Sequence, residues 1–268
     1  MKVAMQTITR CNGTYFTGLT LPLILCLFIF SSMSGCGWMA GPPVQDPMAR
    51  DLIEQLALKN QNLSRLKGIM HIRLISAQGN LSGRAALAAI YPDRIRVEWL
   101  TFLGQPLMRF AADGKNVVID LHDEDQMYRV KQSPTALQKL IQIPIGIEDL
   151  LQILKGAPPL PEYAAAQMRP AEAQKTKVAL IGRWHVLKGE LKTSADCTIE
   201  EMTAFQNDGA ISYRVRWKDW RPQQGYELPR DIEITAGTGD ILSLLIDRVY
   251  PEVPVLPELF QLDVAPSH

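Results

Sequence analysis

The chain has 268 residues with 28 basic and 28 acidic side chains, so its formal net charge is zero. That length is enough for one large domain or two small ones. A nucleic-acid-binding protein is expected to show a basic excess, and the balanced charge argues against that class.

The first 35 residues have the features of an export signal. Lys2 and Arg10 precede an apolar run over 19–30, and small polar residues follow it. A positively charged N-terminal region, a short apolar run and small residues at the cleavage site are typical of a secretory signal peptide. The run is shorter than the 20 or so residues that a membrane-spanning helix needs. We therefore predict a cleaved signal peptide over 1–35, with an uncleaved signal anchor as the alternative.

The end of this segment reads Met33-Ser34-Gly35-Cys36 and resembles the bacterial lipobox. The resemblance implies cleavage before Cys36, a diacylglycerol on its sulfur and an acyl group on the new N-terminus. Two or more acyl chains suffice for stable membrane anchoring. Residues 36–47 are then a lipidated tether, and the domain follows over 48–268. Ordinary secretion with a coincidental cysteine remains the alternative.

The remaining cysteine and histidines do not form a recognisable reactive site. Cys11 and Cys26 leave with the signal peptide, so Cys197 has no partner for a disulfide or a zinc site. We expect Cys197 to be a small buried hydrophobe. The four histidines are scattered, and no GxSxG, P-loop or GxGxxG motif occurs. The sequence therefore predicts no enzyme, no cofactor and no metal site.

Hydrophobic spacing divides the rest of the chain into a helix, a block of strands, an insert and a second block of strands. Leucines at helical offsets predict a helix over 47–67, and alternating apolar residues predict strands on both sides of the insert. The insert, 134–174, is predicted to form a helical lid, with helices over 134–142 and 147–155 and a helix or a loop over 162–174. The first expected strand starts at 69, and the others are 81–91, 94–99, 107–112, 116–122, 127–131, 177–180, 183–191, 199–205, 211–217, 230–235 and 242–249.

About eleven strands and few helices exclude a doubly wound sheet. The pattern favours a mainly β (α+β) fold, with one strongly curved antiparallel sheet or incomplete barrel and helices on its concave face. Antiparallel neighbours joined by short turns are the simplest topology for such a chain. Two separate small domains are the alternative, but each half alone would bury only a modest core.

Large apolar side chains cluster where the strand over 94–99 ends. Leu100, Phe102 and Leu103 follow the alternating strand, and Gly104 and Pro106 force a turn. Exposed apolar side chains at a loop tip often mark a binding surface. The segment is either a hydrophobic finger that enters a membrane or a partner, or a loop that folds back onto the core.

Several stretches together resemble the LolA/LolB superfamily of periplasmic lipoprotein carriers, in particular its lipoprotein branch. They are the lipobox with the helix after it, PDRIRVEWLTFLGQPLMRFAADGKNVVI over 92–119, IPIGIEDLLQILKGAPPLP over 143–161 and LPRDIEI over 228–234. The resemblance implies an incomplete antiparallel barrel of about eleven strands, with lid helices over an apolar cavity. It also implies an exposed leucine on an early loop, which falls on 100–103 here without the usual Pro-Leu-Gly order. Gly37, rather than Asp, follows Cys36, which resembles an outer-membrane address.

The function implied is the binding of acyl chains of lipoproteins or lipids and their delivery to the outer membrane, without catalysis. The partners implied are acyl chains, a soluble LolA-like periplasmic carrier and the membrane reached through the lipid anchor; no nucleic acid is expected, and the protein is expected to be a monomer. A structural or adaptor lipoprotein with the same fold is the rival interpretation, and an envelope hydrolase is a third. Alternation does not distinguish a cavity from a filled core, so the expected lining residues are candidates: Ile72, Leu74, Ile95, Val97, Trp99, Leu150, Leu154, Tyr213, Val215 and Trp217.

Overall fold

The computed structural model describes residues 42–77, 79–121, 126–134, 136–171 and 175–262. Contacts between residues divide the chain into two units, 1–41 and 42–268, and the helices and strands below belong to the second unit. The predicted signal peptide, Cys36 and the first part of the tether lie outside the described residues.

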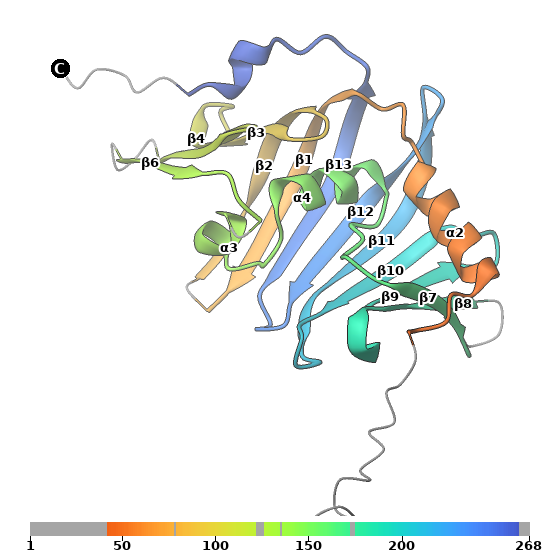
Figure 1. The fold of residues 1–268 in the computed structure, drawn as a ribbon. Helices are drawn as coiled ribbons and strands as arrows, with labels where there is room; N and C mark the ends of the chain where they lie inside the picture. The colour runs from red at the N-terminus through yellow and green to blue at the C-terminus, as the bar shows by residue number, and fades with distance from the viewer. Residues whose placement is uncertain (1–41, 78, 122–125, 135, 172–174, 263–268) are drawn as a thin grey trace, which may run out of the picture. The chain divides into compact units, whose positions relative to one another are not determined.

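The described chain folds into one open antiparallel sheet of 13 strands (Figure 1). Its strand order is β6-β5-β4-β3-β2-β1-β13-β12-β11-β10-β9-β8-β7, so the two blocks of strands in the sequence meet at the pairing of β1 with β13. The predicted fold class is confirmed, and the alternative of two separate small domains is wrong. The strands are β1 (Arg65–Ser76), β2 (Gly79–Ile90), β3 (Arg94–Leu100), β4 (Pro106–Asp113), β5 (Asn116–Leu121), β6 (Gln126–Lys131), β7 (Ala165–Arg169), β8 (Lys175–Ile181), β9 (Leu187–Ser194), β10 (Ile199–Phe205), β11 (Ile211–Gln223), β12 (Tyr226–Ala236) and β13 (Ile241–Pro251).

Three helices, α2 (Pro47–Leu58), α3 (Ala136–Ile141) and α4 (Ile147–Lys155), lie against the concave face of the sheet (Figure 1). Asp46 caps α2, because its carboxylate accepts a hydrogen bond from the Met48 amide at 2.9 Å. The predicted continuation of this helix to residue 67 is wrong, because the chain turns after Leu58 and enters β1 at Arg65. No helix in the described part of the chain is both long and apolar enough to cross a membrane.

The structure corrects two further expectations. The segment 162–174 contains β7 rather than a helix, because Ala165 and Ala166 are small, fully buried residues that pair with β8 at the edge of the sheet. The predicted lid over 134–174 therefore has helices only in its first half. Cys197 is exposed rather than buried, because it lies in the β9–β10 turn with a left-handed φ of 61°.

The turns of this meander alternate between two ends of the sheet. The turns β1–β2, β3–β4, β8–β9, β10–β11 and β12–β13 share one end, which we call the β1–β2 end. The register supports this assignment, because Ile75 near the end of β1 pairs with Ile241 at the start of β13. The turns β2–β3, β4–β5, β9–β10 and β11–β12 and the end of β13 lie at the opposite end.

The segment after β13 crosses the outer face of the sheet. Val255 and Phe260 are buried against Ala88 on β2, and Leu262 is buried against β4 and β5. Arg96 on β3 donates a hydrogen bond to the carbonyl of Leu259 at 2.6 Å. This contact covers the outside of the same strands whose inner side chains form the candidate site described below.

Glu201 on β10 joins an ion-pair network on the outer face. Its carboxylate accepts hydrogen bonds from Lys192 at 2.8 Å and from Arg216 at 2.9 Å. Partial burial works to raise the pKa of Glu201, but the hydrogen bonds from Lys192 and Arg216 outweigh it and hold the pKa below the usual value for a glutamate. A carboxylate with a depressed folded-state pKa stabilises the fold above its unfolded pKa, and that stability is lost as the pH falls through the folded pKa.

We therefore expect Glu201→Gln to lower the free energy of unfolding by about 1 kcal/mol at neutral pH. The difference from wild type should shrink toward zero as the pH falls through the lowered folded-state pKa, where wild-type Glu201 also becomes neutral. Urea denaturation across this pH range checks both values. Glu200→Gln is the matched control, since Glu200 is the neighbouring acid on β10 and forms a more exposed ion pair with Lys175 at 3.0 Å. A pH-independent loss for Glu201→Gln would contradict the assignment.

Candidate functional site: an apolar cavity under helices α3 and α4

An apolar cavity of about 160 Å³ lies between the concave face of the sheet and helices α3 and α4. Every side chain around it is a hydrocarbon, a thioether or an aromatic ring. The lining comes from six strands and two helices: Met70, Ile72, Leu74, Leu81, Ile95, Val97, Trp99, Met108, Phe110, Ile119, Leu242, Leu244, Leu137, Ile141, Leu150 and Leu154. An apolar space of this size stays dry and accepts a small apolar molecule.

The structure brings seven of the ten predicted lining residues to this cavity and leaves three elsewhere. Ile72 and Leu74 face it from β1, Ile95, Val97 and Trp99 from β3, and Leu150 and Leu154 from α4. The other three, Tyr213, Val215 and Trp217, are buried but do not line it. Their placement in the cavity lining was wrong.

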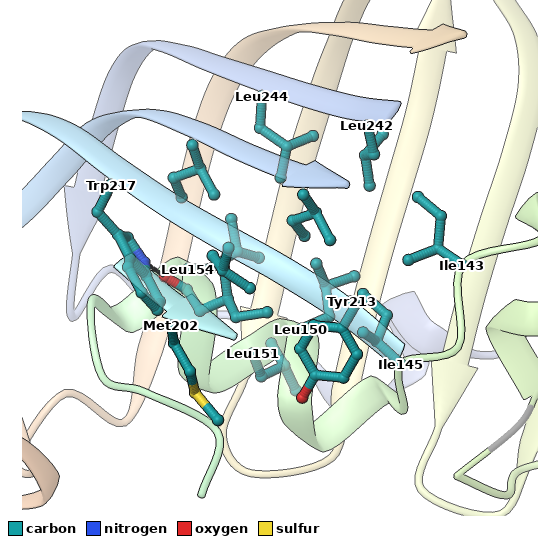
Figure 2. Close-up of a cluster of buried hydrophobic side chains, with 14 of the residues drawn as sticks. Ile143, Ile145, Leu150, Leu151, Leu154, Met202, Tyr213, Trp217, Leu242 and Leu244 are labelled. Atoms are coloured by element: carbon teal, nitrogen blue, oxygen red, sulfur yellow. Dashed lines mark hydrogen bonds between the residues drawn. The ribbon is translucent and has the colours of Figure 1, made fainter. Parts of the chain in front are cut away.

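Helix α4 is the reason that these three residues are excluded. It packs directly on β11 and β12, and the Trp217 indole donates a hydrogen bond to the Ile153 carbonyl at 3.0 Å (Figure 2). Leu151 and Ile153 are fully buried in that contact region. The helix therefore fills one half of the concave face and leaves the cavity over the other half, above β1 to β5 and the start of β13.

Both ends of α4 are held in place. Gly146 donates its amide to Asp149 at 3.3 Å at the start of the helix, and Gly156 closes it in a left-handed conformation. Lys155 in the last turn donates to the Gln61 carbonyl at 3.1 Å, and burial lowers the pKa of Lys155. A cation at a helix C-terminus also suits the helix dipole. This helix therefore forms a fixed wall of the cavity.

Helix α3 is a much smaller wall. It has six residues, and Leu137 and Ile141 reach the cavity from it. Leu137 is buried, whereas Ile141 is only partly covered. Unlike α4, this short helix has a partly covered side chain at the cavity, Ile141.

The rim of the cavity lies at the β1–β2 end of the sheet. Leu81 lines the cavity and is nevertheless 55% exposed, next to the β1–β2 turn. Trp99 lies across β2 at Gly83, where a Cβ atom would stand 2.1 Å from the indole nitrogen. Glycine at position 83 thus leaves room for the Trp99 ring against the backbone of β2.

The β3–β4 loop projects from the same end of the sheet. The amides of Thr101 and Gly104 donate to the carbonyls of Gln105 and Thr101 at 2.8 and 2.9 Å, so the loop is a closed turn. Gly104 has a φ of 83°, which favours glycine. Phe102 is 97% exposed and Leu103 is 70% exposed.

The three residues considered for the hydrophobic finger therefore differ in position. Leu100 is the last residue of β3 and is half-buried, whereas Phe102 and Leu103 point away from the core. The alternative that all three fold back onto the core is wrong for Phe102 and Leu103. An exposed apolar pair on a closed turn is suited to contact with a lipid surface or an apolar partner.

Nine residues that line the cavity were not predicted from the sequence. Met108 and Phe110 on β4, and Leu242 and Leu244 on β13, alternate along their strands in the same way as the residues that were chosen. That signal was present in the sequence, but alternation marks an inward face without showing which strands lie over open space. The remaining five are Met70, Leu81, Ile119, Leu137 and Ile141.

Within the described residues, no group of three or more His, Cys, Asp or Glu side chains is placed to hold a metal ion. The cavity itself presents no acid, base or nucleophile from its lining. Its chemistry is therefore the transfer of apolar surface out of water.

No protein-family model matches the chain. Outer-membrane lipoprotein LolB of Vibrio cholerae is 25% identical over 95 residues. The matched stretch covers 35% of this chain, and this chain spans about half the length of that protein, at 46%.

Solved structures match a much larger part of the chain. A LolA superfamily protein from Nitrosomonas europaea has a TM-score of 0.55 at 11% identity, over 83% of this chain and 100% of its own. A putative outer-membrane lipoprotein-sorting protein domain from Vibrio parahaemolyticus has a TM-score of 0.53 at 11% identity, over 80% and 96%. A DUF1329 family protein from Desulfovibrio piger reaches a TM-score of 0.56 at 6% identity, over 80% and 96%. These matches confirm the resemblance of this chain to the LolA/LolB superfamily, and they show that its fold is LolA-like.

Proposed function

We propose that this protein is a lipid-anchored carrier that binds acyl chains of lipoproteins or lipids in its apolar cavity and hands them to the outer membrane. The observation that carries the proposal is the cavity, because all sixteen side chains around it are apolar and its rim is exposed at one end of the sheet. The LolA-like fold and the similarity to an outer-membrane lipoprotein support it. The proposed role is binding and transfer, without catalysis.

Energetics explain why such a carrier needs this lining. Exposing a chain of 16 carbons to water costs roughly 12 kcal/mol, at about 0.8 kcal/mol per CH₂ group. A cavity of hydrocarbon side chains offers nearly the same environment as a membrane. Transfer from the cavity to the membrane is then close to neutral in free energy and needs no nucleotide.

The size of the cavity indicates how a long chain enters. A space of about 160 Å³ accepts one short apolar group rather than a whole acyl chain. In the proposal a longer chain therefore enters when α3 moves away from the sheet while α4 stays in place.

The anchor determines where the cavity works. In the proposal Cys36 carries the acyl chains of the mature protein, and Gly37 after it directs the protein to the outer membrane. A soluble LolA-like carrier is the proposed donor of the cargo. The exposed Phe102 and Leu103 are then the part of the β1–β2 end that contacts the donor or the acceptor membrane.

Native mass spectrometry of the mature chain from Gly37 tests the binding step. Since all the described helices and strands lie between Pro47 and Phe260, this chain carries the whole described fold. We expect co-purified acyl ligand, and uptake of a fluorescent fatty acid by ligand-free protein. A protein that carries no acyl ligand and takes up no fatty acid would contradict the carrier proposal and favour the structural or adaptor alternative.

A further inference from the structure

Trp184 is a second exposed aromatic residue that the proposed transfer step does not use. It lies in η1 (Arg183–His185), the short turn between β8 and β9, and its side chain is 90% exposed. Tryptophan is the largest side chain in proteins and rarely stands so fully in water. Its position therefore requires a physical explanation.

The backbone makes the choice of tryptophan still less favourable. Trp184 has a φ of 62° and His185 has a φ of 59°, so two consecutive residues are left-handed. Glycine and asparagine adopt this conformation at little cost, and they dominate hairpin turns of this kind. The Trp184 ring recovers little of the cost by packing, because it is almost fully exposed. An asparagine would suit the turn better if folding were its only task.

The turn lies next to the point where the tether enters the folded unit. Asp46 donates its amide to the Ala166 carbonyl at 2.9 Å, and Gln167 donates to the Val44 carbonyl at 3.1 Å. These contacts fix the end of the tether on β7, which pairs with β8 just before η1. In Figure 1 the described start of the chain and η1 lie at the same corner of the sheet.

The length of the tether limits how far this corner can lie from a lipid on Cys36. Five residues lie between Cys36 and Pro42, so six steps along the chain join them, and a fully extended chain spans at most about 3.6 Å per step. The chain therefore allows Pro42 to lie at most roughly 20 Å from the proposed acylated residue.

The surroundings of Trp184 suit a phospholipid surface. A groove beside it is lined by Tyr163 and by the cations Arg183 and Lys188, with Glu162 as the acid in the same lining. Tryptophan and tyrosine prefer the headgroup level of membranes, and cations favour anionic headgroups. The turn also lies at the β1–β2 end, which carries the exposed Phe102 of the β3–β4 loop.

We propose that the β8–β9 turn is a membrane-docking element, whose Trp184 side chain enters the headgroup region of the phospholipid layer that holds the acyl chains of Cys36. This inference rests on the proposed lipidation of Cys36. Contacts at Trp184 and at the β3–β4 loop, on opposite flanks of one sheet end, hold the cavity rim toward the lipid surface.

The test measures binding of the mature chain from Gly37 to vesicles of phosphatidylethanolamine and phosphatidylglycerol. Trp184→Asn should weaken vesicle binding roughly tenfold, because it removes the interfacial aromatic ring. The same variant should keep or raise Tm, because asparagine tolerates the left-handed turn. Trp184→Phe should retain most of the binding. Leu256→Asn is the matched control, since Leu256 is 72% exposed beyond β13 at the opposite end and should leave binding unchanged.

Equal vesicle binding by Trp184→Asn and wild type, or no binding by wild type, overturns the inference. A lowered Tm together with lost fatty-acid uptake in Trp184→Asn also overturns it, because Trp184 would then be a structural residue. Failure of the proposed anchor is recognised separately, by an intact mass of the full-length mature protein that lacks acyl groups. The vesicle measurement does not depend on that result, because the chain from Gly37 has no Cys36.

Discussion

Val97→Phe is expected to reduce fatty-acid uptake at least roughly tenfold while leaving Tm unchanged or higher. Val97 points into the cavity from the centre of β3, and the added ring would fill the space that the ligand needs. Filling an empty apolar cavity normally stabilises a fold. Fatty-acid titration and thermal unfolding of the same variant measure the two effects.

Val215→Phe provides the matched control on the filled half of the concave face. Val215 is fully buried on β11, outside the cavity lining and in the half that α4 packs against. Overpacking a filled core costs about 1–3 kcal/mol, which lowers Tm by roughly 2–12 °C for a chain of this size. A Val97→Phe protein that is destabilised like Val215→Phe would show that the space above β3 is filled core, and the carrier proposal would lose its basis.

The double change Phe102→Glu with Leu103→Glu is expected to slow transfer of a bound acyl chain to membranes by about tenfold or more. Both side chains are exposed, so the change removes no core contact and should leave Tm and fatty-acid uptake near wild type. Two carboxylates would be repelled by an anionic lipid surface and would not enter it. Transfer of a fluorescent fatty acid from the loaded protein to vesicles measures the effect.

Leu58→Glu is the control for this loop. Leu58 ends α2, away from the cavity lining, and is 57% exposed. Its change to Glu should leave the transfer rate unaltered. If the loop variant unfolds, Phe102 and Leu103 belong to the core; if it folds and transfers at the wild-type rate, another surface delivers the chain.

Local patterns in the sequence were sufficient for most of the secondary structure and for the fold class. In β3, Ile95, Val97 and Trp99 alternate with charged residues, and this alternation alone predicts that one face of the strand is buried. Helix α4 is similarly determined by its apolar spacing, its early acids and Gly156 after its last residue. The end of α2 was misjudged because Leu63 and Leu66 continue its spacing although they are buried in a turn and in β1.

The sequence by itself therefore determined which strand residues point inward, that the fold is mainly antiparallel β, and that apolar side chains gather on the β3–β4 loop. Only the tertiary structure decided which inward faces surround a cavity. Val97 on β3 and Val215 on β11 both point inward from strands with alternating apolar residues. Helix α4 packs over β11, where its Ile153 carbonyl accepts a hydrogen bond from Trp217, and Val97 lines the cavity instead. That difference depends on where a helix between the two strand blocks comes to rest, and helix placement is set by long-range packing that no local spacing records.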